Sequence, residues 1–492
     1  MALIIVLGLT CAYVAWTLFC LETNLRKARL LGVPVVRTPF NVNSHLWVVV
    51  QPLVWKLLAW FRIPWSSYPD IVRFSHRNWH FLEKSDPITR FGPVWALVCP
   101  GGIHLHFADP EVIEDIFSRW RDFVRPVHKY QVLSIFGPSL FNAPIDEWPR
   151  HRKAVAAPFN EPTMKFVWSE TLRQSQSMVS YWVGHSAKGI PDLQRDTRTV
   201  TLNVLASTAF REKYDFIGSA DLRKEDLSTA RSFRDALLLV HKYIVHLMVI
   251  PYQYLLRPIM PKPLSRIGHA AKCLRDIMAE VVAQEKTALD GGDPGSGGLI
   301  TSLVRAIDHM SKRGVLSLDE TLGNVFMINF AGLDTTANVM AFMLMRLAGE
   351  PDLQDWLCDE ILVISDGRPA QDWEYELFPR FKRCYAVLLE TLRLYAPVTS
   401  LPKMTTTGQT VQVDGRSIAI PAGTDVFPML LGIQTDPRYW TDPFAWKPSR
   451  WIERPVGCTS FADEQLVDPP KRGVFPLVRG APKLSWEEVV AD

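Results

Sequence analysis

The chain begins with an uninterrupted apolar run. Residues 2–21 hold no charged side chain, and at about 1.5 Å of helix rise per residue such a run spans the roughly 30 Å hydrocarbon core of a bilayer. Arg26, Lys27 and Arg29 follow the run, and no Lys or Arg precedes it. This asymmetry predicts an uncleaved transmembrane signal-anchor over residues 1–21, with the following chain in the cytosol. A cleaved signal peptide, the alternative, has a basic start and a shorter apolar stretch.

A second apolar stretch covers residues 46–61, where Gln51, Pro52 and Lys56 interrupt it. We expect a helix that lies at the membrane interface rather than a second span. An ordinary core helix is the alternative. Residues 22–45, which contain basic residues and proline, are expected to connect the anchor to the globular part.

Helical patterns dominate the rest of the chain. Ser317 and Glu320 form a capping box before an apolar helical run over residues 318–348, and a second helix is predicted over residues 381–395. Residues 411–420 alternate around an Asp-Gly pair, which is typical of a tight β-hairpin.

These patterns predict a mainly α-helical fold with a small β region, built as a single domain over residues 46–492. The glycine-rich stretch 291–298 suits a mobile loop, but one loop does not establish a domain boundary. At about 150 residues per domain the length alone would favour about three domains, and the continuous helical pattern argues against that division.

The composition narrows the classes of function. The 54 basic and 51 acidic residues nearly balance, so no nucleic-acid partner is expected. The seven cysteines are scattered and include no Cys-x-x-Cys pair, which argues against a disulfide framework or a structural zinc site and favours a reducing compartment. They are Cys11, Cys20, Cys99, Cys273, Cys358, Cys384 and Cys458.

A cluster of poor helix formers interrupts the long helix at Ala331-Gly-Leu-Asp-Thr-Thr336. A local opening beside a bound cofactor would explain the cluster, because Gly332 would let a flat ligand approach the backbone. Asp334 and Thr335 could then form an acid–alcohol pair that relays protons. The structural alternative is an exposed aspartate and a threonine that bonds back to the carbonyl one turn earlier.

Three further sets of polar residues could bind or stabilise a ligand site. Glu390 and Arg393 share a helical face, and Arg450 could complete a planar network with them, although such pairs are also common on solvated surfaces. Trp148 and Arg152, four residues apart, could bind a carboxylate or form an ordinary helix contact. The last is Lys403, a possible carboxylate partner or a solvated lysine.

The order of these features resembles that of a eukaryotic microsomal cytochrome P-450, a haem-thiolate monooxygenase, and is closest in style to fungal members. After the anchor come Trp-x-x-x-Arg at 148–152, Ala-Gly-x-Asp-Thr-Thr at 331–336, Glu-x-x-Arg at 390–393, Ile-Pro-Ala-Gly-Thr at 420–424 and Phe-x-x-x-Pro-x-Arg-Trp at 444–451. The resemblance covers essentially the whole chain.

The resemblance implies a mainly α-helical fold with haem b buried between two helices, and it assigns roles to the residues above. It implies an oxygen pocket lined by Ala331 and Gly332, with protons delivered by Asp334 and Thr335. It implies a fold locked around the haem by Glu390, Arg393 and Arg450, and haem propionates held by Trp148, Arg152 and Lys403.

The same resemblance implies the partners and the location of the protein. Electrons would come from an NADPH-dependent cytochrome reductase, and the chain would be single-pass in the endoplasmic reticulum membrane, with the lipid bilayer as a partner and the catalytic domain in the cytosol. The substrate would be an apolar small molecule, hydroxylated or epoxidised with O2 in secondary-metabolite biosynthesis.

One defining feature of that family is missing. Members carry a Phe-x-x-Gly-x-Arg-x-Cys-x-Gly loop whose cysteine ligates the haem iron. Aligned without a gap, residues 475–488 place Leu484 where the cysteine is required. A gap fits better, with a short segment that includes the cysteine absent between Pro482 and Lys483, and the domain is then expected to be truncated at its C-terminus. Cys458 lacks the flanking Gly and Arg and is expected to be a free surface thiol.

These observations leave several hypotheses open. The first is a monooxygenase, and the second is a catalytically inactive product, either a degenerate paralogue or a chain that lost the ligand segment through splicing or gene annotation. A haem-thiolate isomerase or dehydratase would not need the Asp334-Thr335 pair. A membrane-tethered helical scaffold would bind no haem. Cys358 and Cys384 are expected to be packed on helices.

Overall fold

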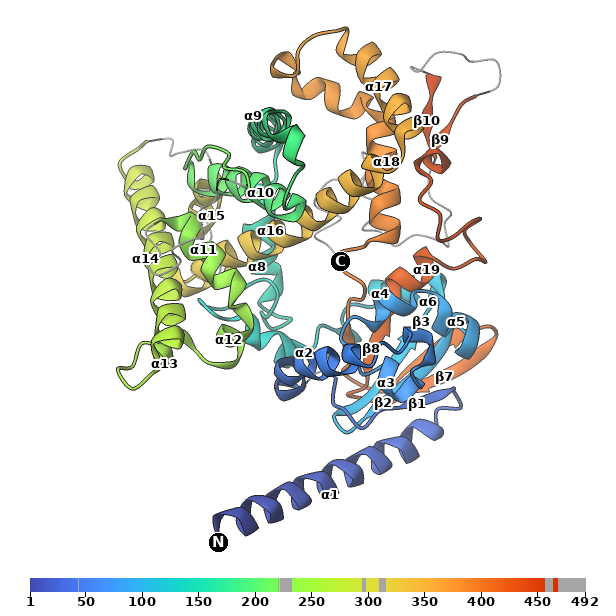
Figure 1. The fold of residues 1–492 in the computed structure, drawn as a ribbon. Coiled ribbons are helices and arrows are strands. Elements are labelled where there is room, and N and C mark those ends of the chain that lie inside the picture. The colour runs from blue at the N-terminus through green and yellow to red at the C-terminus, as the bar shows by residue number, and fades with distance from the viewer. Residues whose placement is uncertain are drawn as a thin grey trace. The chain divides into compact units, whose positions relative to one another are not determined.

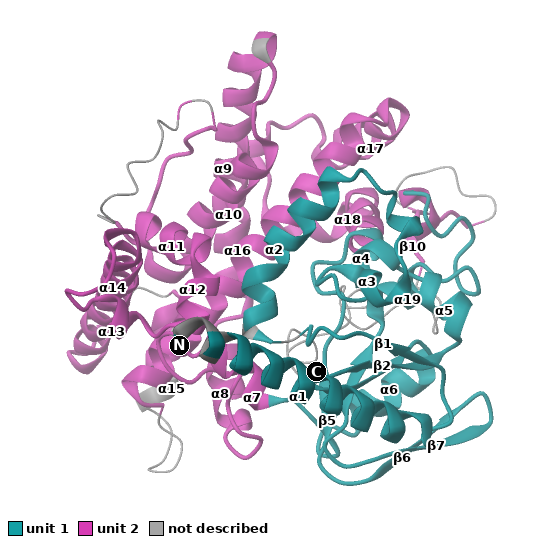
Figure 2. Ribbon diagram, turned by 60° about the horizontal axis from the view of Figure 1, so that its bottom comes forward, with its two compact units in different colours: residues 1–126, 393–446, 468–479 teal, residues 127–392, 447–467, 480–492 magenta. Residues whose placement is uncertain are grey.

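The computed structural model describes residues 1–42, 44–219, 221, 232–293, 298–308, 316–455 and 463–467. Contacts divide the chain into two compact units, shown in teal and magenta in Figure 2. Unit 1 comprises residues 1–126, 393–446 and 468–479, and unit 2 comprises residues 127–392, 447–467 and 480–492. The sequence predicted a single domain from residue 46, whereas unit 1 also includes the residues before it.

A six-stranded sheet forms the centre of unit 1. Its order is β1-β2-β3-β8-β5-β4, in which β1 pairs parallel to β2 and β3 pairs parallel to β8. The strands are β1 Val35–Arg37, β2 Val94–Cys99, β3 Gly102–Phe107, β4 Phe123–Val124, β5 Lys403–Thr405 and β8 Asp425–Pro428. Figure 1 shows the blue β3 beside the orange β8, so the sheet joins segments from distant parts of the sequence. All six residues of β2 are buried, as expected for a strand inside a sheet.

Short helices and a hairpin accompany the sheet of unit 1. The helices are α3 Asp70–Arg73, α4 Trp79–Glu83, α5 Asp86–Phe91, α6 Pro110–Ser118 and α19 Leu430–Gln434. The predicted hairpin is confirmed, with β6 Gln409–Val413 paired antiparallel to β7 Arg416–Ile420. Asp414 and Gly415 at its turn have φ of 49° and 73°, the left-handed conformation that the tight turn requires.

The N-terminal helix extends beyond the predicted anchor. Helix α1 spans Ala2–Arg29, and near its end Leu25 and Ala28 are buried in the core of unit 1. The side chain of Asn24 donates to the backbone carbonyl of Cys99 at 3.0 Å. The segment predicted as a connector therefore supplies the end of α1 and strand β1 to unit 1. Helix α2, His45–Trp60, follows and is capped by Ser44.

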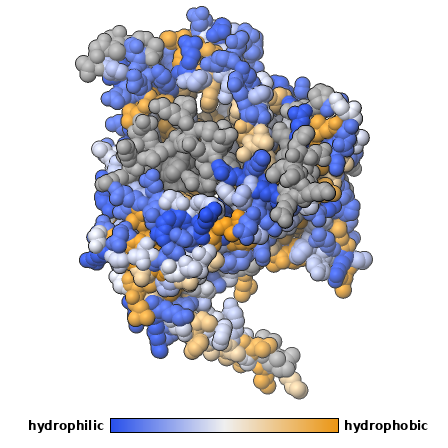
Figure 3. Space-filling model, turned by 180° about the vertical axis from the view of Figure 1, so that it is seen from behind, coloured by the Kyte–Doolittle hydropathy of each residue, from blue (hydrophilic) through white to orange (hydrophobic). Residues whose placement is uncertain are grey.

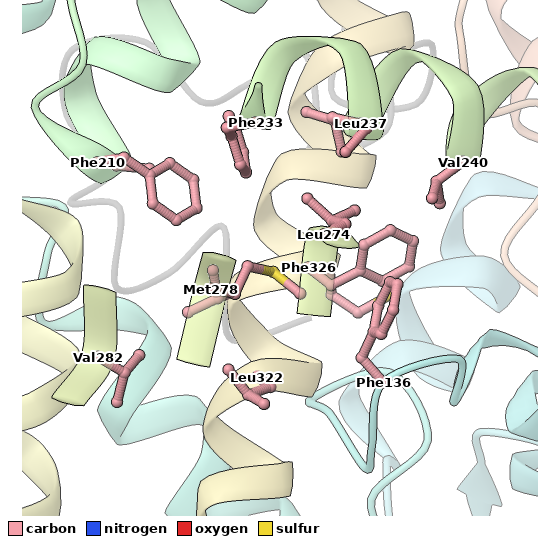
Figure 4. Packing of buried hydrophobic residues seen from close by; sticks show 14 of the residues in the cluster. Phe136, Phe210, Phe233, Leu237, Val240, Leu274, Met278, Val282, Leu322 and Phe326 are labelled. Carbon is pink, nitrogen blue, oxygen red and sulfur yellow. The ribbon is translucent and has the colours of Figure 1, made fainter. Parts of the chain in front are cut away.

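Unit 2 is built almost entirely from helices. The longer ones are α8 Trp148–Ala156, α9 Glu161–His185, α10 Leu193–Phe210, α11 Phe233–Lys242, α14 Lys262–Asp290, α15 Leu299–Asp308, α16 Leu318–Ala348, α17 Pro351–Ser365 and α18 Lys382–Leu394, whose last two residues fall in unit 1. The short ones are α7 Val127–Tyr130, α12 Ile244–Val249 and α13 Tyr252–Leu255, and β9 Ile452–Glu453 pairs with β10 Gln465–Leu466. Figure 4 shows the core, where Phe136, Phe233 and Phe326 pack with aliphatic side chains of α14 and α16.

Helix α16 has the bounds that the sequence predicted. The side chain of Ser317 accepts from the amide of Glu320, and the Glu320 carboxylate accepts from the amide of Ser317, so both bonds of the capping box are present. Among the described residues, α16 is the one helix whose length and hydropathy suit a membrane span. Leu322, Val325 and Phe326 are buried in the core of unit 2, which accounts for its apolar character.

Candidate haem-monooxygenase site

The Ala331–Thr336 motif does not open helix α16, which continues without a break from Leu318 to Ala348. The hydroxyl of Thr335 donates to the carbonyl of Ala331 at 2.6 Å. This is the bond to the carbonyl one turn earlier that we expected if the motif had a structural role. A Cβ atom added to Gly332 would lie 3.2 Å from the Leu205 side chain. The glycine therefore allows α10 and α16 to pack closely.

The carboxylate of Asp334 contacts basic side chains from two other helices. Its carboxylate lies 3.0 Å from Nε of Arg198 on α10 and 3.5 Å from Nδ1 of His241 on α11. Burial raises the pKa of Asp334, but the hydrogen bond with His241 and the charge of Arg198 outweigh burial, and the net shift is downward. Asp334 is therefore held as a carboxylate at neutral pH.

Asp334 also faces a cavity of about 410 Å³ within unit 2. The cavity lies among α10, α11 and α16, and its lining contains more basic than acidic side chains. The charged residues are Asp192, Arg195, Arg198, Arg234, Lys242 and Asp334. A carboxylate that borders a polar cavity on one side and a buried imidazole on the other can pass protons between them.

Trp148 and Arg152 share one face of α8, as predicted. The Arg152 guanidinium carbon lies 5.4 Å from the centre of a Trp148 ring. An indole N–H and a guanidinium that are held together suit a carboxylate ligand. His151, on the same helix, is fully buried.

A hydrogen-bond network ties α8 to the start of α16. The side chain of Asn324 accepts from the amide of Leu140 at 2.8 Å, and its Nδ2 donates to Nδ1 of His151 at 2.9 Å. The other ring nitrogen of His151 lies 3.4 Å from the Glu320 carboxylate, which also accepts from Arg150 at 2.5 Å. Desolvation lowers the pKa of His151, so the ring is neutral and its proton lies on Nε2.

The same network includes a set of side chains with metal-binding potential. Glu147, His151 and Glu320 each bring one ligand atom within 4.8 Å of the others. A metal ion needs an unprotonated ring nitrogen, but Asn324 donates to Nδ1 of His151 and thereby leaves the proton on Nε2. The geometry thus favours a hydrogen-bonded link between helices over a metal site.

Glu390 on α18 is completely buried and accepts hydrogen bonds from residues 447, 450 and 451 of unit 2. It receives the amide of Lys447 at 2.8 Å, Nε of Arg450 at 3.1 Å and the indole of Trp451 at 3.0 Å. The predicted association of Glu390 with Arg450 is therefore present. A solvated surface pair, the alternative, does not fit a fully buried carboxylate.

Arg393, also fully buried, anchors a loop of unit 1. Its guanidinium donates to the carbonyls of Gln434 at 2.8 Å, Pro443 at 2.7 Å and Ala445 at 3.1 Å. The guanidinium also lies 4.8 Å from the centre of the Trp440 ring. These bonds fasten the end of α18 to the segment that precedes the Phe-x-x-x-Pro-x-Arg-Trp motif and to the start of the motif itself.

Lys403 lies on strand β5 of unit 1 and is buried rather than solvated. Its ammonium group sits 4.6 Å from the centre of the Phe117 ring, a cation–π contact that partly replaces water.

The described residues fit the carboxylates of a haem better than its iron. Trp148 and Arg152 provide a carboxylate-binding pair, but the described cysteines lie on α1, β2, α14, α17 and α18, none of them on α8 or α16. Burial raises the pKa of the Cys384 thiol to about 12, so Cys384 is no thiolate. Cys358 is exposed, and its predicted packing is wrong because it lies on the outer face of α17. Cys458 and residues 475–488 lie outside the described residues.

Sequence reasoning missed the partners of the predicted residues. Arg198 and His241 pair with Asp334 across 136 and 93 positions of sequence, so no local spacing indicates them. Phe136 and Phe233 are buried in the core of unit 2. The apolar character of these residues was visible in the sequence, but their burial was not.

Comparisons with a family model, with related sequences and with solved structures all indicate the same family. The family model of cytochrome P-450 matches residues 78–462. A cytochrome P-450 monooxygenase of Arthrobotrys oligospora is 28% identical over 477 residues, with 91% of this chain and 79% of the relative covered. A cytochrome P-450 monooxygenase of the phomenoic acid biosynthesis cluster of Leptosphaeria maculans is 25% identical over 489 residues and covers 87% of this chain and 79% of its own length.

The fold agrees with these matches. The crystal structure of a cytochrome P-450 haem domain superposes with a TM-score of 0.58 at 18% identity, covering 76% of this chain and 78% of the other. This likeness concerns the fold alone. Since the family model covers most of the chain, and the motifs lie on α8, α16 and α18, this protein belongs to the cytochrome P-450 family.

Proposed function

We propose that the protein is a membrane-bound monooxygenase that uses haem b, O2 and electrons from an NADPH-dependent reductase to hydroxylate or epoxidise an apolar small molecule. Haem, when bound, supplies the activation of oxygen. The named relative from the phomenoic acid cluster supports a role in secondary metabolism.

The position of Asp334 is the observation that carries this proposal. A monooxygenase must bring protons from water to a buried site, and Asp334 borders both a cavity and buried His241. Thr335 lies next in the helix and, with its hydroxyl bonded to the Ala331 carbonyl, presents an oxygen that can pass a proton onward. In the proposal Ala331 and Gly332 line the oxygen pocket beside this pair.

The other predicted residues hold the cofactor and the fold. Trp148, Arg152 and Lys403 would bind the haem propionates through an indole N–H and two cations. Glu390, Arg393 and Arg450 would keep the loops on either side of residue 446 in place, which their buried hydrogen bonds support.

A second candidate function follows from the missing iron ligand. Aligned without a gap, the sequence places Leu484 where the cysteine is required, and leucine cannot bind iron. With a gap between Pro482 and Lys483, the segment with the cysteine is absent. A chain with this sequence would be a catalytically inactive member of the family. In the monooxygenase proposal, the cysteine comes from a segment encoded between Pro482 and Lys483.

Sequencing transcripts across the codons for Pro482 and Lys483 distinguishes the two candidates. An in-frame segment that encodes a cysteine flanked by Gly and Arg supports the monooxygenase. Transcripts that all join the two codons directly would refute it and leave the inactive candidate.

Helix α1 is proposed as a single-pass anchor in the endoplasmic reticulum membrane. Its side chains Leu9, Trp16 and Phe19 are between 63% and 67% exposed, which a water-facing helix would not favour. Arg26, Lys27 and Arg29 at its end support a cytosolic location for the rest of the chain.

A further inference from the structure

Helix α2 carries an apolar stripe that unit 1 does not cover. Leu46, Val49, Leu53 and Leu57 are exposed by 52% to 65%, and Trp60 is exposed by 81%. Their spacing of three or four residues places them on one face of the helix. An exposed row of this kind marks a surface that meets an apolar partner.

The opposite face of α2 is fixed to unit 1. Trp47 is buried and its indole donates to the carbonyl of Ser75 at 2.9 Å. Gln51, also buried, accepts from the amide of Arg77 at 3.0 Å. These bonds hold helix α2 against unit 1, so its apolar stripe keeps one orientation relative to the sheet of unit 1.

The charges around the stripe identify the partner. Residues 23–69 contain six Lys or Arg residues and no Asp or Glu. A segment of 47 residues with this imbalance is attracted to a surface that carries negative charge. An apolar stripe in a stretch of sequence whose only charges are positive fits a bilayer with anionic headgroups better than it fits a protein surface of mixed charge.

The apolar surface continues from α2 to α1. A groove of about 540 Å³ between the two helices is lined by Val14, Trp16, Leu18, Leu46 and Val50 among others. The part of α1 visible at the bottom of Figure 3 is coloured mostly tan and orange, which marks apolar residues. The two helices thus offer one connected apolar surface within unit 1.

We infer that α2 lies in the plane of the membrane, with Leu46, Leu53, Leu57 and Trp60 among the acyl chains and Lys56 and Arg62 at anionic headgroups. This inference rests on the proposed membrane location, but it adds a second contact with a different geometry. Helix α1 would cross the bilayer, whereas α2 would lie on it and hold unit 1 against its surface.

Photocrosslinking from single positions of the full-length protein tests the inference. A benzophenone amino acid replaces Leu53, and the protein is reconstituted into vesicles of phosphatidylcholine with phosphatidylserine that carry a labelled acyl chain. The matched control carries the same probe at Leu362, which is 64% exposed on α17. We expect lipid labelling at position 53 to exceed that at position 362 several-fold.

Charge variants test the headgroup contact. Lys56→Glu and Arg62→Glu, made together, should lower the labelling from position 53 in vesicles with phosphatidylserine and have a smaller effect in vesicles of phosphatidylcholine alone. Equal loss in both vesicles would contradict the role of anionic lipid.

The outcomes separate this inference from the proposed anchor. Crosslinks from position 53 to a second copy of the chain, or labelling no higher than at position 362, would overturn the inference. Extraction of the same samples at alkaline pH reports on α1: retention in the membrane without lipid labelling would refute the α2 contact alone, and release with strong labelling would refute the span while supporting α2.

Discussion

At the scale of single residues, Glu390 and Asp334 each bind side chains from distant parts of the chain: Glu390 binds Arg450, and Asp334 binds Arg198 and His241. Asp334, Glu390 and Arg450 were recognisable because polar residues are conspicuous inside or beside apolar helices. The pairing of Glu390 with Arg450 could be predicted from residue type alone. The partners of Asp334 could not, because they come from two other helices and depend on how those helices pack.

Replacing Glu390 with glutamine tests its buried network. Glu390 is fully buried and accepts from Lys447, Arg450 and Trp451. The side-chain NH2 group of Glu390→Gln would point at one of these donors. The Arg450 guanidinium would also lose its ion pair with the Glu390 carboxylate. We expect a loss of about 3–5 kcal/mol in the free energy of unfolding, measured by chemical denaturation followed by circular dichroism.

The control for that variant is Glu376→Gln. Glu376 is an exposed carboxylate that pairs with Lys165 at 2.8 Å, and solvent screens such pairs. No measurable change is expected. If the two variants unfold at the same denaturant concentration, the buried network does not stabilise unit 2.

Two glycines make a second matched pair. A Cβ atom at Gly323 would lie 2.2 Å from the Pro138 carbonyl oxygen, whereas one at Gly184 would meet nothing within 4 Å. Gly323→Ala should destabilise the protein by about 1–3 kcal/mol because a backbone segment must move. Gly184→Ala, inside helix α9, should stabilise by about 0.5–1 kcal/mol. Thermal unfolding shifts of the same sign in both variants would contradict the packing of residues 137–138 on α16.

At the scale of elements, short sequence motifs predicted the helix start and the hairpin that form within a few residues of them. The capping box of α16 and the Asp-Gly turn of β6-β7 each lie within a few residues, and both elements were found as predicted. Strand β1 was predicted as part of a connector, because its pairing with β2 joins residues 35–37 to residues 96–98 and leaves no local pattern. The sequence also left α2 open between an interfacial and a core helix, and in the structure one face of α2 is exposed while Trp47 and Gln51 on the other face are buried.

The link between α8 and α16 predicts a pH dependence of stability. Desolvation lowers the pKa of His151 below its usual 6.5, so the unfolded chain binds a proton that the folded chain does not. The stability from the neutral ring is fully present above a pH of about 6.5 and is lost as the pH falls from there toward the folded pKa. The His151→Gln variant should therefore lose less stability than the parent between about pH 7.5 and pH 5.5.

Denaturant titrations of both proteins across this range check the prediction. His76, His80 and His106, whose pKa values burial also lowers, are present in both proteins and cancel in the comparison. Parallel pH profiles would show that His151 is not held neutral in the folded state.

At the scale of the whole molecule, the order of motifs along the chain predicted the family, and the family model and the helical fold confirmed it. The sequence did not predict that segments from both ends of the chain would share one sheet, since that sheet forms through pairings such as β3 with β8 across more than 300 positions. Neither the motifs of the sequence nor the described residues supply the cysteine ligand of the iron.

The absorbance of the reduced protein with carbon monoxide tests the central claim most directly. The protein should be produced in a fungal host from its complete gene, with introns, so that any segment between Pro482 and Lys483 is included. The monooxygenase proposal predicts the red-shifted Soret band of a thiolate-ligated haem. It also predicts that the 492-residue chain, expressed from its own coding sequence, lacks that band because the segment with the cysteine ligand is absent between Pro482 and Lys483. A haem-free protein, or a haem without the thiolate band, from the complete gene would contradict the proposal.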